Sequence, residues 1–145
     1  MHRRILTTVV AVALLAMAAP AGAHHREGPC DIHWRDGGSE EIRRDVRRLI
    51  LCAWDRFRPG HGGPRRALEV ARCESGFWPW AVGGSNLGVF QHQARYWPRR
   101  FELLVERNPL RASWELSPSA LDARTNVIVT ALYVRRFGWS AWACA

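Results

Sequence analysis

The stretch ARCESGFWPWAVGGSNLGVFQH, at positions 71–92, combines a single acid with aromatic residues and a glycine-rich segment. The acid is Glu74, and it is followed closely by Trp78 and Trp80. If one of these rings, or that of Trp139, shields the carboxyl group from water, its pKa rises and it keeps its proton near neutral pH. A protonated carboxyl group is the acid that cleavage of a glycosidic bond requires, and tryptophan-lined clefts suit sugars. The stretch is compatible with a carbohydrate-cleaving site, and the alternative is a solvated glutamate at a helix end with tryptophans that belong to the core.

A predicted helix positions this carboxyl group. Proline is tolerated at the first position of a helix, so Pro64 is the expected start, and Gly76 is the expected end. The buried side of this helix is expected to consist of Ala67, Leu68, Val70 and Ala71. Glu74 then lies in the last turn, where the helix dipole disfavours a negative charge.

The remaining pattern is mostly helical. A helix is predicted from an N-cap at Ser39 through Phe57, because apolar residues recur there at helical spacing. The segment 77–86 predicts a short β-hairpin or an irregular loop. The other predicted helices are two short ones at 87–96 and 98–107 and a long one, capped at Ser117-Pro118 and ended by Gly138.

The beginning of the chain predicts export. Residues 1–23 have two arginines, an apolar run and a small-residue ending, the order of a secretory signal peptide. We expect residues 24–38 to form an N-terminal arm and residues 39–145 to form one domain. The protein is then secreted and acts at the cell wall, without stable membrane insertion after signal cleavage, as a monomer.

Charge and cysteine content narrow the class further. The net charge is +8, and every basic residue is arginine. A basic exported protein can bind nucleic acid, anionic lipid or an anionic cell wall, and a solvated charged surface without such a partner is the alternative; no nucleic-acid-binding motif is present. Four cysteines follow the signal peptide, which favours two disulfides with three alternative pairings. Their spacing matches no zinc site, and we expect neither a metal nor a cofactor.

Three elements, in this order, resemble the soluble lytic transglycosylases and goose-type lysozymes of the lysozyme superfamily. The first is Glu74-Ser75 at the end of an apolar helix, and the second is Gly-Val-Phe-Gln at 88–91. The third is LDARTNVIVTALYV, which has Asp122, Asn126 and Tyr133 at matching positions. The ending GWSAWAC is similar to that of small secreted actinobacterial members. Together the resemblance covers about residues 67–144.

This resemblance implies a mainly α, lysozyme-like domain that cleaves the glycan strands of peptidoglycan. Glu74 is the implied catalytic acid, and Ser75 supports it. The implied substrate-binding residues are Gly88, Phe90 and Gln91 in the loop, Ser75 beside them, and Tyr133 on the later helix. For Gln91 the alternative is a loop amide that only bonds to backbone groups.

Two further assignments come from the resemblance. The larger transglycosylases have an Ala-Tyr-Asn-Ala-Gly element that is absent here, so Tyr133 or Trp139 is the candidate to face the acid. Tyr133 as a core or helix-surface tyrosine is the alternative. The short secreted members also imply a disulfide between Cys73 and Cys144, which leaves Cys30 to pair with Cys52.

The reaction type depends on a second carboxylate. The candidates Glu102, Glu106 and Asp122 lie in helix-like stretches and are expected to be solvated. Hydrolysis through two carboxylates would need one of them beside Glu74. We therefore expect a lytic transglycosylase. The alternatives are a muramidase on the same fold, a non-catalytic wall-binding module, and a small basic domain that acts on membranes.

Overall fold

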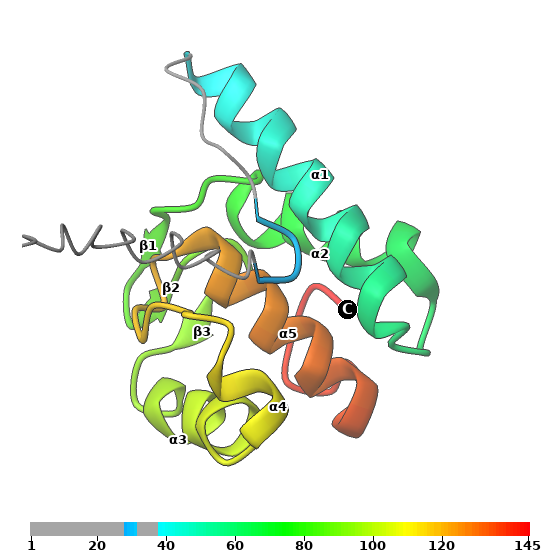
Figure 1. The fold of residues 1–145 in the computed structure, drawn as a ribbon. Coiled ribbons are helices and arrows are strands. Elements are labelled where there is room, and N and C mark those ends of the chain that lie inside the picture. Colours follow the sequence, from blue (N-terminus) through cyan, green and yellow to red (C-terminus); the bar gives the residue numbers. More distant parts are fainter. Residues whose placement is uncertain (1–27, 32–37) are drawn as a thin grey trace, which may run out of the picture.

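The computed structural model describes residues 28–31 and 38–145. The predicted signal peptide and most of the predicted arm lie outside the described residues. The described part contains five α-helices, one π-helical segment and a small antiparallel sheet (Figure 1). The prediction of a mainly α fold with a short β element after the Glu74 helix is confirmed.

Helix α1 (Ser39–Phe57) packs against both α2 and α5 (Figure 1). Its buried side includes the predicted apolar residues Val46, Leu49, Ile50, Ala53, Trp54 and Phe57. The predicted cap is wrong by one residue, because Ser39 is already helical and Gly38 is the N-cap. The backbone N–H of Gly38 donates to the Glu41 carboxylate at 2.8 Å, so the side chain that reaches back belongs to Glu41.

Helix α2 (Gly63–Ser75) has the expected limits. Pro64 lies in its first turn, and Gly76 ends it in the left-handed conformation at φ 61°. Ala67, Val70 and Ala71 are fully buried against the neighbouring elements. Glu74 therefore stands in the last turn, as predicted.

The sheet after α2 consists of three two-residue strands, β1 (Val82–Gly83), β2 (Asn86–Leu87) and β3 (His92–Gln93). They are antiparallel in the order β1-β2-β3. The helix predicted at 87–96 is wrong, because the segment consists of the end of β2, the strand β3 and turns at 88–91 and 94–96. The turn between the two strands contains Gly88 at φ 76° and Gln91 at φ 46°, backbone conformations that no α-helix has.

The next elements are α3 (Trp97–Phe101), the π-helical η1 (Glu102–Glu106) and the short α4 (Pro109–Ala112). The first two together confirm the helix predicted at 98–107. Both α3 and η1 pack against α5. They form the lower part of the molecule in Figure 1, where α3 lies next to the end of the sheet.

Helix α5 (Ala123–Phe137) begins later than predicted. The cap is Asp122, whose carboxylate accepts the Thr125 N–H at 2.7 Å, and Ser117-Pro118 lies in the preceding loop. Gly138 ends the helix, as predicted. Ten of the fifteen residues of α5 are buried, so this helix forms the centre of the core.

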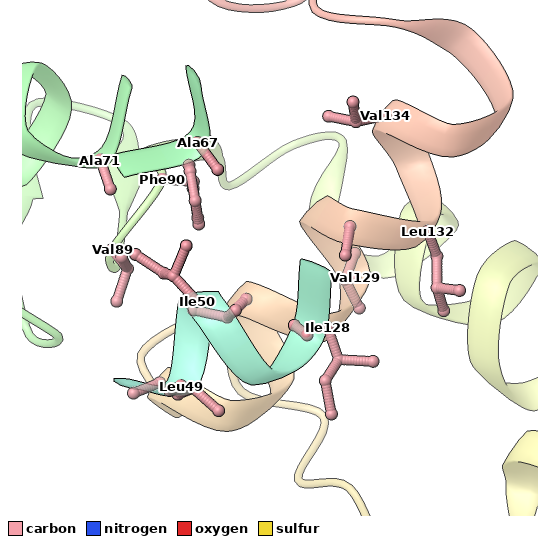
Figure 2. Close-up of a cluster of buried hydrophobic side chains, with 14 of the residues drawn as sticks. Leu49, Ile50, Ala67, Ala71, Val89, Phe90, Ile128, Val129, Leu132 and Val134 are labelled. Atoms are coloured by element: carbon pink, nitrogen blue, oxygen red, sulfur yellow. The ribbon is translucent and has the colours of Figure 1, made fainter. Parts of the chain in front are cut away.

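The core also contains two residues of the turn between β2 and β3. Val89 and Phe90 are fully buried. Figure 2 shows them among side chains of α1, α2 and α5. These neighbours include Leu49, Ile50, Ala67, Ala71, Ile128 and Val129. The turn that contains Gln91 is therefore anchored in the hydrophobic core.

Two disulfides join Cys30 to Cys52 and Cys73 to Cys144, which confirms both pairings. The first ties residue 30 to α1, and the second ties the C-terminal tail to the last turn of α2. Within the described residues, no helix combines the length and the apolar character that crossing a membrane demands.

Candidate active site

Glu74 lines a cleft of about 270 Å³. The cleft lies where the end of α2, the small sheet, the beginning of α3 and the C-terminal tail come together. The other lining residues are Asn86, Gln91, Gln93, Tyr96, Arg100, Ala141, Trp142 and Ala143. The predicted acid is thus accessible from a cleft that also presents amide, aromatic and cationic side chains.

The electrostatic environment of Glu74 favours its protonated form. The side chain is partly buried, and loss of contact with water raises the pKa of its carboxyl group above the ordinary value. A hydrogen bond from the backbone of Cys144 acts in the opposite direction and lowers this pKa, but by less. The carboxyl group therefore keeps its proton to a higher pH than a solvated glutamate does, and it has a fixed donor that stabilises its ionised form.

The C-terminal tail owes its position to two attachments. The Cys73–Cys144 disulfide joins it to the residue directly before Glu74. The Trp142 indole N–H donates to the carbonyl oxygen of Phe90 at 2.6 Å. Together these bonds place the Trp142 ring in the wall of the cleft and the Cys144 N–H at the Glu74 carboxyl group.

Ser75 connects the end of α2 to the turn that contains Gln91. Its hydroxyl oxygen lies 2.7 Å from the carbonyl oxygen of Val89 and 3.3 Å from that of Ala71. The single hydroxyl proton points toward the closer acceptor. Ser75 therefore attaches the turn to the end of α2, and it does not line the cleft, so its predicted substrate contact is absent here.

Gln91 lines the cleft, but its amide nitrogen is already occupied. Nε2 donates to the carbonyl oxygens of Ala81, at 3.1 Å, and Gly88, at 2.8 Å. An amide NH₂ group has only two hydrogens, so both are used in backbone bonds. The loop-amide interpretation is correct for Nε2, and only the side-chain oxygen is left to accept a hydrogen bond from a ligand.

The side chain of Asn126, on α5, forms hydrogen bonds with the same turn and with the segments next to it. This fully buried side chain accepts the Phe90 N–H at 3.0 Å and donates to the carbonyl oxygens of Leu87, at 3.2 Å, and Ala120, at 2.8 Å. Gly88 passes so close that a Cβ there would lie 2.4 Å from Asn126 Nδ2. A glycine at 88 and an amide at 126 are therefore both needed for this packing.

Replacement of Asn126 by alanine should destabilise the protein and disturb the cleft. Three backbone groups lose their partner inside the core, at a cost of about 2–3 kcal/mol in the free energy of unfolding. Asn108→Ala is the matched control, because it removes an asparagine that accepts an exposed N–H at the start of α4. Urea unfolding should show the larger loss for Asn126→Ala, and equal losses would contradict the role of Asn126.

Two of the predicted substrate-binding residues have structural roles. Phe90 is fully buried in the core, so it cannot contact a sugar in this structure. Because Gly88 has no side chain, its backbone packs closely against Asn126 and the Ala120 carbonyl oxygen. The close approach expected between Gly88 and a substrate is therefore a contact within the protein. The sequence motif that contains both residues therefore shapes the turn, and only Gln91 of that turn lines the cleft.

The aromatic residues expected beside the acid also differ. Trp78 and Trp80 pack edge to face on each other, and Trp139 stacks on Trp54. None of these rings lines the Glu74 cleft, which has Tyr96 and Trp142 in its wall. Tyr133 does not face the acid either; it lines an adjacent depression with Phe137. The distance along the sequence was a poor guide to the rings that line the Glu74 cleft.

Glu74 is the only carboxylic acid that lines the cleft in the described part of the chain. Glu102 pairs with Arg107 at 2.9 Å and shares a separate depression with Glu106. Asp122 is the cap of α5. None of these three acids lines the Glu74 cleft.

Glu74 and Gln91 are the predicted residues that line the cleft, and the unpredicted ones include Asn86, Gln93, Tyr96, Arg100 and Trp142. The tail pattern and the Cys73–Cys144 pairing together contained a signal for Trp142, because they bring residue 142 to the end of α2. Among residues 28–31 and 38–145, no cluster of three or more His, Cys, Asp or Glu side chains is arranged to hold a metal ion.

Comparison of the chain with protein-family models, with curated proteins and with solved structures finds no match. The function is therefore inferred from the chemistry of the cleft and from the sequence elements that surround Glu74.

Proposed function

We propose that the protein is a lytic transglycosylase that cleaves peptidoglycan glycan strands, with Glu74 as acid and then as base. One observation supports this most directly: a partly buried carboxyl group with a raised pKa lines a cleft in which no other described residue is acidic. A two-carboxylate glycosidase requires a partner, about 5 to 10 Å from the acid, to act as nucleophile or to activate water. The site fits a reaction in which one carboxyl group serves in both steps.

In the first step the Glu74 proton passes to the glycosidic oxygen that leaves with C4 of N-acetylglucosamine. The bond from C1 of N-acetylmuramic acid breaks, and Glu74 becomes a carboxylate. In the second step this carboxylate takes the proton of the muramic C6 hydroxyl, whose oxygen bonds to C1 and closes a 1,6-anhydro ring. The proton balance closes, no water is consumed, and Glu74 is again protonated.

The environment of Glu74 suits both steps. Burial favours the protonated state that the first step needs, and the Cys144 N–H stabilises the carboxylate that forms in it. The exposed ring of Tyr96 offers an apolar surface to the sugars, and the buried Trp142 forms part of the cleft wall behind it. Gln91 lines the cleft, and its side-chain oxygen is the acceptor that we assign to an N-acetyl or hydroxyl group of the substrate.

Export to the cell wall is part of the same proposal. The two disulfides are of the kind that forms in oxidising compartments. Removal of residues 1–23, which contain Arg3 and Arg4, changes the net charge from +8 to +6, and this positive charge favours accumulation on an anionic wall. The test of the function is release of soluble glycan fragments from purified peptidoglycan by the oxidised protein. Binding without release by a folded protein would favour the wall-binding module.

The rate of fragment release should fall as pH rises, and the decline should follow the ionisation of one group, Glu74. The first step needs protonated Glu74, so kcat/KM declines as pH rises through the pKa of this group in the free enzyme. Because burial raises that pKa, the midpoint of the decline should lie above the ordinary value of 4.5. A pH–rate profile with soluble glycan checks this, and a decline centred below 4.5 would contradict the environment described for Glu74.

A further inference from the structure

Arg100 is a cation in the Glu74 cleft that has no counter-ion within the described residues. It lines this cleft and also the adjacent apolar depression of about 300 Å³, so it lies on the boundary between the two. Five other arginines pair with carboxylates: Arg47, Arg48, Arg65, Arg66 and Arg107. Arg100 forms no such pair with any acid of residues 28–31 or 38–145, although Glu74 lines the same cleft.

A buried histidine holds the guanidinium group in place. Arg100 Nη1 donates to His92 Nδ1 at 2.6 Å, so the histidine proton must be on Nε2. Nε2 in turn donates to the Thr130 hydroxyl at 2.8 Å, and that hydroxyl donates to the Asn126 carbonyl oxygen at 2.7 Å. Burial and the neighbouring Arg100 keep the pKa of His92 well below its ordinary range, so His92 is a neutral acceptor. Arg100 is thereby oriented without being neutralised.

Three aromatic rings surround the same guanidinium group. Its central carbon lies 4.6 Å from the ring centre of Tyr133, 5.5 Å from that of Trp142 and 6.0 Å from that of Tyr96. Ring faces attract a cation but provide no negative charge. A guanidinium has five N–H donors in one plane, and a single one of them bonds within the described residues. The group is therefore rigid, charged and able to donate further hydrogen bonds.

We infer that Arg100 is a carboxylate-binding residue of the cleft, and that the carboxylate belongs to the muramic acid unit of the glycan. This inference rests on the proposed function. A planar guanidinium is suited to bidentate recognition of a carboxylate. Muramic acid has a lactyl group on C3, whose carboxyl is free in peptide-stripped strands and is bonded to a peptide, itself ending in carboxylates, in ordinary strands. N-acetylglucosamine has no such group.

The consequence is a fixed register of the glycan. The bond that breaks joins C1 of muramic acid to N-acetylglucosamine, so the enzyme must distinguish two sugars with the same N-acetylated ring. A carboxylate on Arg100 identifies the muramic unit and places it beside Glu74. Arg100 is then a specificity-determining residue, and Tyr133 takes part by packing against it.

The test measures binding to catalytically inactive Glu74→Gln protein by calorimetry. The ligands are a peptide-free tetrasaccharide with free lactyl carboxylates, the same strand with stem peptides, both strands with every carboxyl amidated, and a tetramer of N-acetylglucosamine. Amidation should weaken binding by about tenfold or more in at least one of the two strands, since a charge-assisted bond is lost. The strand that responds identifies the lactyl or the peptide carboxylate as the source.

A second substitution in the Glu74→Gln protein, Arg100→Gln, should weaken binding of the responding strand by a similar factor. It should leave the affinity for the N-acetylglucosamine tetramer unchanged. Arg100→Lys keeps the charge and should retain part of the affinity. Arg99→Gln is the matched control, because this neighbouring arginine is exposed and does not line the Glu74 cleft. Binding that is indifferent to amidation in both strands would overturn the inference for Arg100 alone. Absence of binding to every glycan would overturn the proposed function as well.

Discussion

Glu74→Gln should abolish nearly all release of fragments from peptidoglycan while leaving the protein folded. Gln cannot donate a proton to the leaving oxygen or take one from the C6 hydroxyl, so both steps lose their catalyst. The loss expected for removing a general acid is about 10²- to 10⁴-fold in rate. A dye-release assay with purified peptidoglycan measures it.

The matched control for this variant is Glu69→Gln. Glu69 is an exposed acid on the same helix and pairs with Arg65 at 3.1 Å on its outer surface. Its replacement changes the net charge by the same amount and should leave the rate unchanged. Equal activity of Glu74→Gln and the parent would show that Glu74 is not the acid.

Glu74→Gln should not destabilise the folded protein, so a loss of activity in this variant can be assigned to the missing acid. The folded protein holds the Glu74 proton more tightly than the unfolded chain does, because burial raises the pKa of the group. Ionisation of Glu74 therefore lowers stability as pH rises through that pKa. Glu74→Gln removes this cost, so its melting temperature at neutral pH should equal or exceed that of the parent, and any advantage should vanish in acid.

Removal of the Cys73–Cys144 disulfide should reduce both stability and activity. This bond closes a loop with a sequence separation of 71, for which the chain-entropy model gives about 4 kcal/mol in the free energy of unfolding. The double variant Cys73→Ser/Cys144→Ser also frees the tail that provides Trp142 and the Cys144 N–H. Activity should therefore fall even at temperatures where the variant is folded.

The second disulfide provides the control. Cys30–Cys52 has a sequence separation of 22 and lies away from the cleft residues, with an expected contribution of about 3 kcal/mol. Cys30→Ser/Cys52→Ser should lower the melting temperature but retain activity below it. Thermal unfolding and dye release on both double variants separate the two effects. Similar retention of activity in both would contradict a role for the tail in the site.

Local signals in the sequence were sufficient to predict the helix that contains Glu74. Pro64 and Gly76 mark its ends through their own backbone preferences, which do not depend on the rest of the chain. The disulfide pairing followed from a resemblance in the tail. These two features together predicted the place of Glu74 and the covalent bond next to it.

The turn at 88–91 could not be predicted from its own residues. Its backbone is fixed by Asn126, which lies on α5 and bonds to the Phe90 N–H. This contact between distant segments overrides the helical tendency of the segment 87–96. The identity of the aromatic wall depended in the same way on tertiary structure, since Trp142 reaches the cleft through a disulfide and a bond to the Phe90 carbonyl oxygen.

The environment of Arg100 was also invisible in the sequence. Arginines are spread along the whole chain, and several others in the described residues also have no carboxylate partner. Arg100 differs because its position in α3 brings it to His92 of β3 and to three rings from separate segments. Only the assembled fold distinguishes this arginine from the others.

The most direct test of the central claim is mass spectrometry of the fragments that the oxidised protein releases from peptidoglycan in heavy-oxygen water. A transglycosylase that uses Glu74 as acid and base incorporates no solvent oxygen, so the predicted products end in 1,6-anhydromuramic acid and contain no label. Hydrated reducing ends that contain the heavy oxygen would contradict the single-carboxylate mechanism and show that the protein is a muramidase.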